Sequence, residues 1–299
     1  MALIIKTSDT TQATTATAMS PVIEGALYAD RVFIPGLTFT DRYNIGQAGQ
    51  IQVEKYNPDD TVAPKAPGSN FVDSEYQNTV ININCNNGFQ KSSKVPAYFQ
   101  ATMPPTVLAN KTWDTTEAVR VGRQKAAFAA LLDGAGSDAV IQESDDASPI
   151  AAATVKDVLL KDRALINKLH AHPDVVICTV DTYTEILKAA GKDFTPGLND
   201  EMARSGEVGW WLGMLFIQSS MLSQEKTFSY MTGDGVLKNV DTTGVDYIMY
   251  DHSAFSIIDV LVMLRVIDSE LFAGSKVQEE LDTGFAVTNA DCVLIHKHQ

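Results

Sequence analysis

Two pairs of histidines have the spacing that could hold a metal ion. His170 and His172 form one His-x-His pair, and His296 and His298 form the other. On a strand, side chains two residues apart point to the same face and can share one ion. The first pair lies at the end of an expected helix and the second at the C-terminus, and no neighbouring carboxylate or thiol completes a tetrahedral set. We therefore expect no metal site.

Two further patterns contain residue types that are used in catalysis. Ser223 and Lys226 fit the Ser-x-x-Lys spacing of some acyl-transfer enzymes, but no second motif of those enzymes accompanies them. Tyr250, Asp251 and His252 are consecutive. Because adjacent residues on a strand point to opposite faces, these three are not expected to act as one acid–base group. The sequence has no Gly-x-Ser-x-Gly motif either, so we predict no catalytic residue and no enzyme.

Signals for a bound cofactor are equally weak. Gly134, Gly136 and Ala139 fit a Gly-x-Gly-x-x-Ala pattern, but it follows an expected helix and enters a polar loop. The dinucleotide fingerprint requires a strand before it and a helix after it. Trp210 and Trp211 could line a ligand pocket, although such pairs more often pack a core or a subunit contact. We predict no cofactor-binding residue and no cofactor.

Composition excludes several classes of protein. The 299 residues include 23 Lys and Arg against 37 Asp and Glu, a net charge of −14, and no basic cluster stands out. Phosphate binding draws on clustered Lys and Arg, so the chain is expected to be a poor general binder of nucleic acid. The longest apolar runs, near 210–217 and 257–264, are too short to span a bilayer. Three widely separated cysteines indicate reduced, structural thiols.

The N-terminal third contains two segments that are not expected to be stably ordered in an isolated subunit. Residues 1–25 are polar and rich in Thr and Ala, without periodicity. Residues 50–56 and 79–85 alternate polar and apolar side chains, as half-buried strands do. The long polar stretch between them predicts an extended hairpin, which is marginally stable by itself. We expect a neighbouring subunit to hold both segments.

A long helix and a compact α/β unit are expected next. Residues 107–133 have helical spacing, with Asp114 and Glu117 in the pattern of a capping box. Within residues 154–222, Thr154 and Asp181 are each expected to cap a helix, and Gly191 to end the second. Residues 223–246 are turn-rich. The other expected elements are strands at 174–180, 214–217, 247–250, 261–267, 285–288 and 292–295, and a short helix at 253–258.

Three stretches carry a resemblance to a known family. They are Arg204–Ser220, a Gly-spaced segment leading into a strand, then Val175–Leu187, a strand followed by a helix, and finally Tyr250–Phe255 with Thr283–Val287. Together with the hairpin and the long helix, they resemble the major capsid proteins of tailed bacteriophages. The Hong Kong phage-type shell fold of that family is shared with encapsulins.

The resemblance covers nearly the whole chain and implies an α+β capsid fold. It implies an N-terminal arm, an extended E-loop hairpin, a long spine helix, a peripheral (P) domain and an axial (A) domain. The assigned domains are 1–30 for the arm, 31–100 for the E-loop and P-domain strands, 101–150 for the spine helix and P domain, 151–255 for the A domain, and 256–299 for the return to P-domain strands.

The implied function is structural. A protein of this kind self-assembles as hexamers and pentamers into an icosahedral shell that encloses phage DNA without sequence-specific binding. It would be assembled in the host bacterial cytoplasm, would become the virion capsid, and would have no membrane partner. Scaffolding, portal and decoration proteins are candidate partners. Because the arm before the hairpin is short, we expect a separate scaffolding protein or none.

Two alternatives stay open at this point. An encapsulin-like nanocompartment has the same shell fold with a protein cargo, and a soluble α/β enzyme with an unrecognised site is the other. Some shells of the family also join an E-loop lysine to an asparagine of the P domain. Lys55 and Lys65 lie in the expected hairpin and Asn289 near the end, but no motif places them together.

Overall fold

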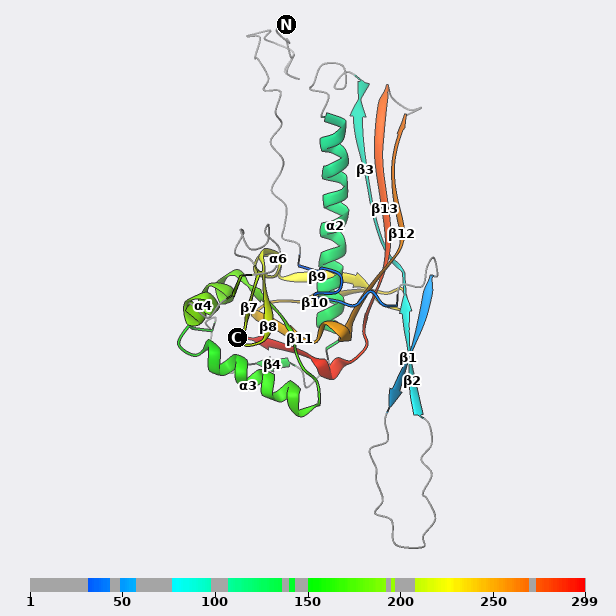
Figure 1. The fold of residues 1–299 in the computed structure, drawn as a ribbon. Coiled ribbons are helices and arrows are strands. Elements are labelled where there is room, and N and C mark those ends of the chain that lie inside the picture. Colours follow the sequence, from blue (N-terminus) through cyan, green and yellow to red (C-terminus); the bar gives the residue numbers. More distant parts are fainter. Residues whose placement is uncertain are drawn as a thin grey trace, which may run out of the picture. The chain divides into compact units, whose positions relative to one another are not determined.

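The chain folds into two compact units (Figure 1). The computed structural model describes residues 32–43, 49–57, 77–97, 107–135, 140–142, 150–191, 195–196, 208–268 and 273–298. Within these ranges, residues 89–122 and 262–281 belong to unit 1, and residues of 29–88, 123–261 and 282–299 belong to unit 2. Four elements contribute to both units: α2 (Val107–Asp133), β3 (Asn87–Pro96), β12 (Phe255–Asp268) and β13 (Gly274–Val287).

A seven-stranded mixed sheet forms the centre of unit 2. Its strand order is β4-β14-β11-β5-β8-β7-β6. Strand β11 pairs antiparallel with β5 and β14, whereas β8 runs parallel to β5 and β4 parallel to β14. The strands are β4 (Val140–Gln142), β5 (Val175–Thr179), β6 (Thr195–Pro196), β7 (Val208–Trp211), β8 (Met214–Ser219), β11 (Val245–Tyr250) and β14 (Val293–Lys297).

Helices α3 (Val155–Lys168) and α4 (Val180–Ala190) pack against this sheet (Figure 1). Each is amphipathic, and the apolar stripe that faces the sheet is buried. The resulting core includes Leu159 and Ile166 of α3, Tyr183 and Ile186 of α4, and Val176, Phe216 and Met249 of the sheet. Burying a side chain of this size contributes about 1.5–3 kcal/mol, so this core stabilises the unit.

The strand β11 is buried on both faces. All six of its residues are buried. Tyr247 and Met249 belong to the core under the helices, while Tyr250 contacts Phe255 edge-on, with ring centroids 6.4 Å apart. Phe255 also contacts Phe33, which continues into a group of rings with Phe128 and Phe228. A strand that is buried on both faces consists of a nearly continuous run of apolar residues, and such a run is why the sequence predicted this strand.

Unit 2 also carries two hairpins. Strands β1 (Gln50–Asn57) and β2 (Gln77–Asn84) pair antiparallel, which confirms the predicted hairpin. The residues between them lie outside the described ranges. Strands β9 (Thr227–Met231) and β10 (Leu237–Asp241) form the second hairpin, which follows the short helix α6 (Ser220–Gln224). The sequence indicated only turns there, because most of these side chains are exposed and give no alternation.

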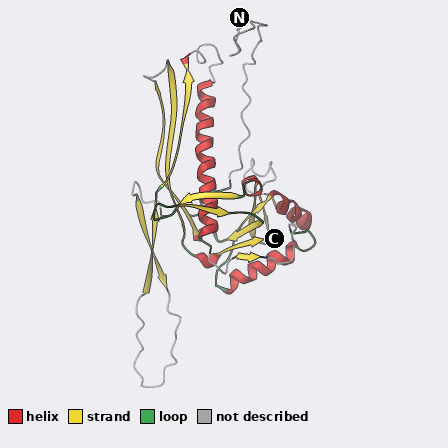
Figure 2. Cartoon of the chain, turned by 180° about the vertical axis from the view of Figure 1, so that it is seen from behind, coloured by secondary structure: helices red, strands yellow, loops and turns green. Residues whose placement is uncertain are grey.

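Unit 1 contains the first part of α2 and a three-stranded sheet of order β12-β13-β3. Figure 2 shows the helix lying along this sheet. Polar contacts join them within unit 1. Thr116 on the helix donates to the buried Glu279 of β13 at 2.6 Å, and Lys91 of β3 pairs with Asp114 at 3.1 Å.

Three predictions of where a helix begins or ends were wrong. Asp114 does not cap α2, which begins at Val107. Asp181 lies inside α4, whose cap is Thr179, accepting a hydrogen bond from the Thr182 amide. The short helix expected at 253–258 is a 3-10 turn, η3 (His252–Ala254), followed at once by β12. A second 3-10 turn, η4 (Ala290–Cys292), precedes β14. At α4 another polar residue suited to capping, Thr179, precedes Asp181, and at 255–258 the chain pairs as a strand instead of forming a helix.

Gly244, between β10 and β11, provides a test of this arrangement. Its φ is +74°, and a Cβ there would lie 2.3 Å from the backbone oxygen of His298. We expect Gly244→Ala to lower the free energy of unfolding by roughly 3 kcal/mol or more, because backbone strain and a backbone clash add. Gly235→Ala is the matched control, since its φ is +76° with nothing within 4 Å. It should cost only about 1 kcal/mol in thermal or urea unfolding; equal losses would contradict the packing at β14.

Candidate functional site

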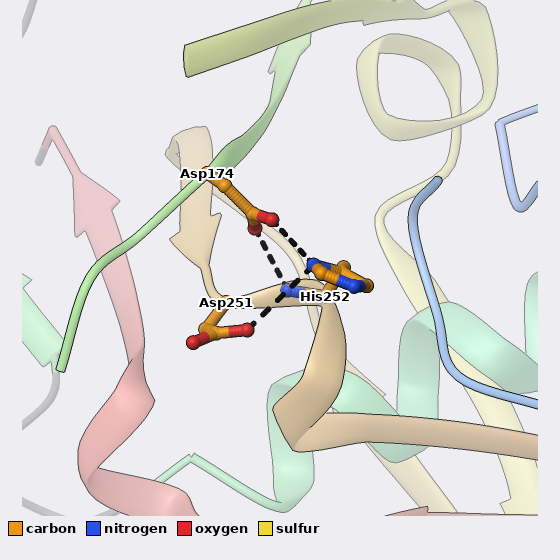
Figure 3. Close-up of side chains that lie close together, drawn as sticks. All are labelled: Asp174, Asp251 and His252. Atoms are coloured by element: carbon orange, nitrogen blue, oxygen red, sulfur yellow. Dashed lines mark hydrogen bonds and ion pairs between the residues drawn. The ribbon is translucent and has the colours of Figure 1, made fainter. Parts of the chain in front are cut away.

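Asp174, Asp251 and His252 gather where β5 begins and β11 ends (Figure 3). Asp174 is paired with the His252 ring through Oδ2 and Nδ1, and its Oδ1 accepts from the His252 backbone amide at 2.8 Å. Asp251 Oδ1 accepts from the Ser253 amide at 2.8 Å and lies 3.7 Å from His252 Nδ1. All three side chains are half-buried.

The three groups have the composition of a metal site, since a ligand atom of each lies within 4.8 Å of the others. However, each carboxylate already accepts a backbone N–H from the η3 turn. This arrangement accounts for the cluster as a polar contact that fixes the chain as it leaves β11. The expectation that no metal binds stays a prediction.

Asp251 and His252 come together because they do not lie on a strand. Strand β11 ends at Tyr250, and the next residues form the η3 turn, where the alternation of a strand no longer holds. Tyr250 is not part of the cluster, because its hydroxyl donates to the backbone oxygen of Thr38 at 2.8 Å. The third member of the cluster is Asp174, which is far from Asp251 and His252 in the sequence.

The pair His296 and His298 also lies among carboxylates. Tyr247 donates to Asp162 Oδ2 at 2.5 Å, and His296 Nδ1 lies 2.9 Å from the same oxygen. The rings of Tyr247 and His296 are stacked with centroids 4.9 Å apart. All three side chains are at most 1% exposed. A buried carboxylate with two such partners joins α3 to β11 and β14.

His298 has a carboxylate of its own. Its Nδ1 lies 2.8 Å from Asp246 Oδ1, which also accepts from the Thr182 hydroxyl at 3.5 Å. Burial raises the pKa of the Asp246 carboxyl, and His298 partly offsets this increase. Nothing in the sequence pointed to Asp162 or Asp246, because the packing of α3 on β14 and the pairing of β11 with β14 bring them to the histidines from positions far apart in the chain.

The remaining sequence signals do not assemble into a site. Ser223 lies in α6, where its hydroxyl donates to the Ser219 backbone oxygen and accepts from the Val180 amide. Trp211 is 6% exposed and belongs to the core, as predicted. His170 and His172 are exposed. Gly136 and Ala139 lie outside the described residues.

The structure shows instead how the β1–β2 hairpin is attached. Its base packs through Ile51, Val53 and Ile83 onto Ile258 of β12, all at most 8% exposed. The glycine at 284 in β13 permits this approach, because a Cβ there would lie 2.8 Å from Cys85 Sγ and 3.2 Å from the Asn84 backbone oxygen.

Three asparagines at and just after the end of β2 hold the turn between β9 and β10. Asn84 and Asn86 donate to the backbone oxygens of Gly233 and Thr232 at 2.7 and 2.6 Å. The buried Asn87 donates to the Met231 oxygen at 3.1 Å and accepts from its amide at 2.7 Å. An asparagine side chain that matches a backbone amide on both sides acts as an extra strand residue.

Lys55 and Asn289, the residues considered for a cross-link, meet within one chain. Lys55 Nζ donates to Asn289 Oδ1 at 3.1 Å, and Asn289 Nδ2 lies 2.8 Å from Cys292 Sγ. This hydrogen bond fixes the hairpin to the segment that leads into β14. Lys65 lies outside the described residues.

The role of Asn87 can be tested directly. Asn87→Ala leaves both the amide and the carbonyl of Met231 without these partners. We expect a loss of about 1–3 kcal/mol in the free energy of unfolding. The control is Asn82→Ala on the exposed side of β2, which should change stability by less than about 0.5 kcal/mol. A similar small change for Asn87→Ala would contradict its anchoring role.

The raised pKa of Asp246 predicts a pH dependence. Its folded state binds a proton more readily than the unfolded state, so this carboxyl favours folding at acidic pH and loses that contribution as pH rises above 3.8 and through the folded pKa. Asp246→Asn removes this titration. We therefore expect the stability of the wild type, measured relative to Asp246→Asn by urea unfolding, to fall as pH rises from acidic to neutral. A constant difference would contradict the assignment.

Comparisons with known proteins find the fold but no close relative. No protein-family model matches the chain, and no curated protein does. Among solved structures, the "Capsid structure of the Cyanophage P-SCSP1u" has a TM-score of 0.74 at 12% identity, covering 95% of this chain and 92% of that one. "Mycobacterium phage Che8" has 0.67 at 13% identity, covering 93% and 95%.

A third solved structure agrees with these two. The "Asymmetric unit of bacteriophage PhiM1 mature capsid" has a TM-score of 0.58 at 12% identity and covers 95% of this chain and 93% of that one. The order of hairpin, long helix and sheet is thus shared along almost the entire length. The chain has the α+β fold of phage capsid proteins, the Hong Kong phage-type fold predicted from its sequence.

Proposed function

We propose that this protein is a major capsid protein that assembles into an icosahedral shell around the DNA of a tailed phage. The observation that carries the proposal is the match to a cyanophage capsid structure over 95% of this chain and 92% of that chain. The match therefore includes nearly all of both chains.

The attachment of the β1–β2 hairpin supports this proposal. Ile51, Val53 and Ile83 at its base are buried, while Val80 and Glu54 are exposed farther along the two strands. An isolated two-stranded hairpin is marginally stable in water. Several features of its base nevertheless fix its direction. They are the apolar packing onto Ile258, the hydrogen bonds of the asparagines and of Lys55, and the close approach that Gly284 permits. A rigidly directed hairpin with exposed faces suits contact with a neighbouring subunit.

The finer assignments belong to the same proposal. We assign residues 1–30 to the arm, 31–100 to the E-loop and P-domain strands, 101–150 to the spine helix and P domain, 151–255 to the A domain, and 256–299 to the return strands. The subunits form hexamers and pentamers in the virion capsid, after assembly in the host cytoplasm with scaffolding and portal proteins. No helix of the described ranges could span a bilayer. The net charge of −14 would make the inner wall of the shell repel packaged DNA instead of binding it.

Neither catalysis nor metal binding is part of this proposal. The carboxylates and histidines of the two clusters, at the two ends of β11, are hydrogen-bonded to backbone or to one another inside unit 2. The encapsulin-like shell and the soluble enzyme have no specific observation in their favour.

Electron microscopy of the purified chain tests the proposal. We expect closed shells or capsomer-sized rings, with light scattering far above the 32.4 kDa of one chain, because the fold places exposed elements for contacts with many neighbours. Particles from infected cells should contain DNA; packaged protein in its place would favour the nanocompartment. A chain that stays monomeric at high concentration, including with phage scaffolding protein, would contradict a shell function.

A further inference from the structure

The turn between β9 and β10 exposes an unusual amount of apolar surface. Val236 is 62% exposed and Leu237 is 63% exposed, the two largest fractions among the large apolar side chains of the described residues. Asp234, in the same turn, is also exposed. Adjacent exposed apolar side chains next to a charge are typical of a surface that contacts another protein.

This turn is held in a fixed shape before any partner arrives. Thr232 exchanges backbone and side-chain hydrogen bonds with Val236, and the Gly235 amide donates to the Thr232 oxygen at 2.8 Å. From outside, Asn84 and Asn86 donate to the oxygens of Gly233 and Thr232. A surface that is already ordered loses little conformational entropy on binding, so its affinity per contact is higher.

The outer face of α3 has a matching character. Leu160 is 41% exposed there, and Lys156, Lys161 and Lys168 are exposed. None of these three lysines takes part in an ion pair with another described residue. The helix carries four basic residues against two acidic ones, although the whole chain has a net charge of −14. An apolar and basic face therefore stands on an otherwise acidic protein.

We propose that the β9–β10 turn of one copy docks on the outer face of α3 of a second copy. The apolar pair Val236 and Leu237 would cover Leu160, and Asp234 would face Lys161 or Lys168. Apolar surface then meets apolar surface and acid meets base, which favours one register of contact over others. This inference rests on the proposed shell function, because it names the surface through which subunits would recognise each other.

A second copy is the occupant that the observations favour. Both surfaces belong to unit 2 but lie at different ends of it (Figures 1 and 2), so they cannot meet within one chain. A contact between two different surfaces of identical subunits is heterologous, and it closes into a ring when the rotation allows. A nucleic acid would match the lysines but not the exposed leucine between them.

Charge exchange tests the pairing. We expect Asp234→Lys alone, and Lys161→Glu with Lys168→Glu, each to raise the concentration needed for assembly by about tenfold. The combination of Asp234→Lys with Lys161→Glu and Lys168→Glu should recover most of this loss, because the salt bridge is restored with its signs reversed. Lys226→Glu is the matched control: this exposed lysine directly precedes β9, at the end of the hairpin opposite the turn, and its change should leave assembly unaffected. Light scattering and electron microscopy measure assembly, and circular dichroism verifies folding.

A cysteine pair gives a second readout that does not depend on weakened assembly. In particles of a Leu160→Cys, Leu237→Cys variant, a mild oxidant should link chains into a ladder on a non-reducing gel, whereas either single variant should stay monomeric. A wild type that does not assemble overturns the shell function and this inference with it. The other outcome is that the wild type assembles, the charge variants assemble equally well and no ladder forms. This result overturns the inference alone and assigns the turn to a different partner.

Discussion

The complete burial of strand β11 is the constraint on which unit 2 depends. Both of its neighbours in the sheet, β5 and β14, are fixed by pairing with it, and its two faces are covered by the helices on one side and by Phe255 on the other. A strand without any exposed side chain cannot shift by one residue, because every side chain would then change faces. Its register therefore determines where the elements around it begin and end.

Polar groups gather at both ends of this buried strand. At one end Asp246 and Tyr247 meet His298, His296 and Asp162, and at the other Asp251 and His252 meet Asp174. Buried polar groups must find hydrogen-bond partners, so they specify the ends of the strand more strictly than apolar packing can. Residue types that suggest catalysis or metal binding in the sequence are thus accounted for as contacts that connect α3, β5, β11 and β14.

The β1–β2 hairpin, in contrast to strand β11, depends little on apolar burial. It has little core of its own, and its direction comes from short contacts at its base, where asparagine side chains bond to backbone groups of β9–β10 and Lys55 bonds to Asn289. These same contacts order the β9–β10 turn with its exposed apolar pair. One polar junction therefore directs two exposed elements at once. A net charge of −14 would disfavour close assembly unless basic surfaces such as α3 met acidic ones.

The sequence by itself determined the elements whose side-chain pattern is strong. The alternation in β1 and β2, the apolar run of β5 and the stripes of α3 and α4 predicted those elements, and their order along the chain indicated the capsid fold. It did not determine β9–β10, where most side chains are exposed, or the start of β13, where polar Ser275 and Glu279 occupy buried positions. It also did not determine the cap of α4 at Thr179 or the start of α2 at Val107. Only the tertiary structure decided which polar residues meet. Asp162 and His296 are 134 positions apart, and Asp174 and His252 are 78 apart. Such pairs are brought together by the pairing of β11 with β5 and β14, and no local spacing records that pairing.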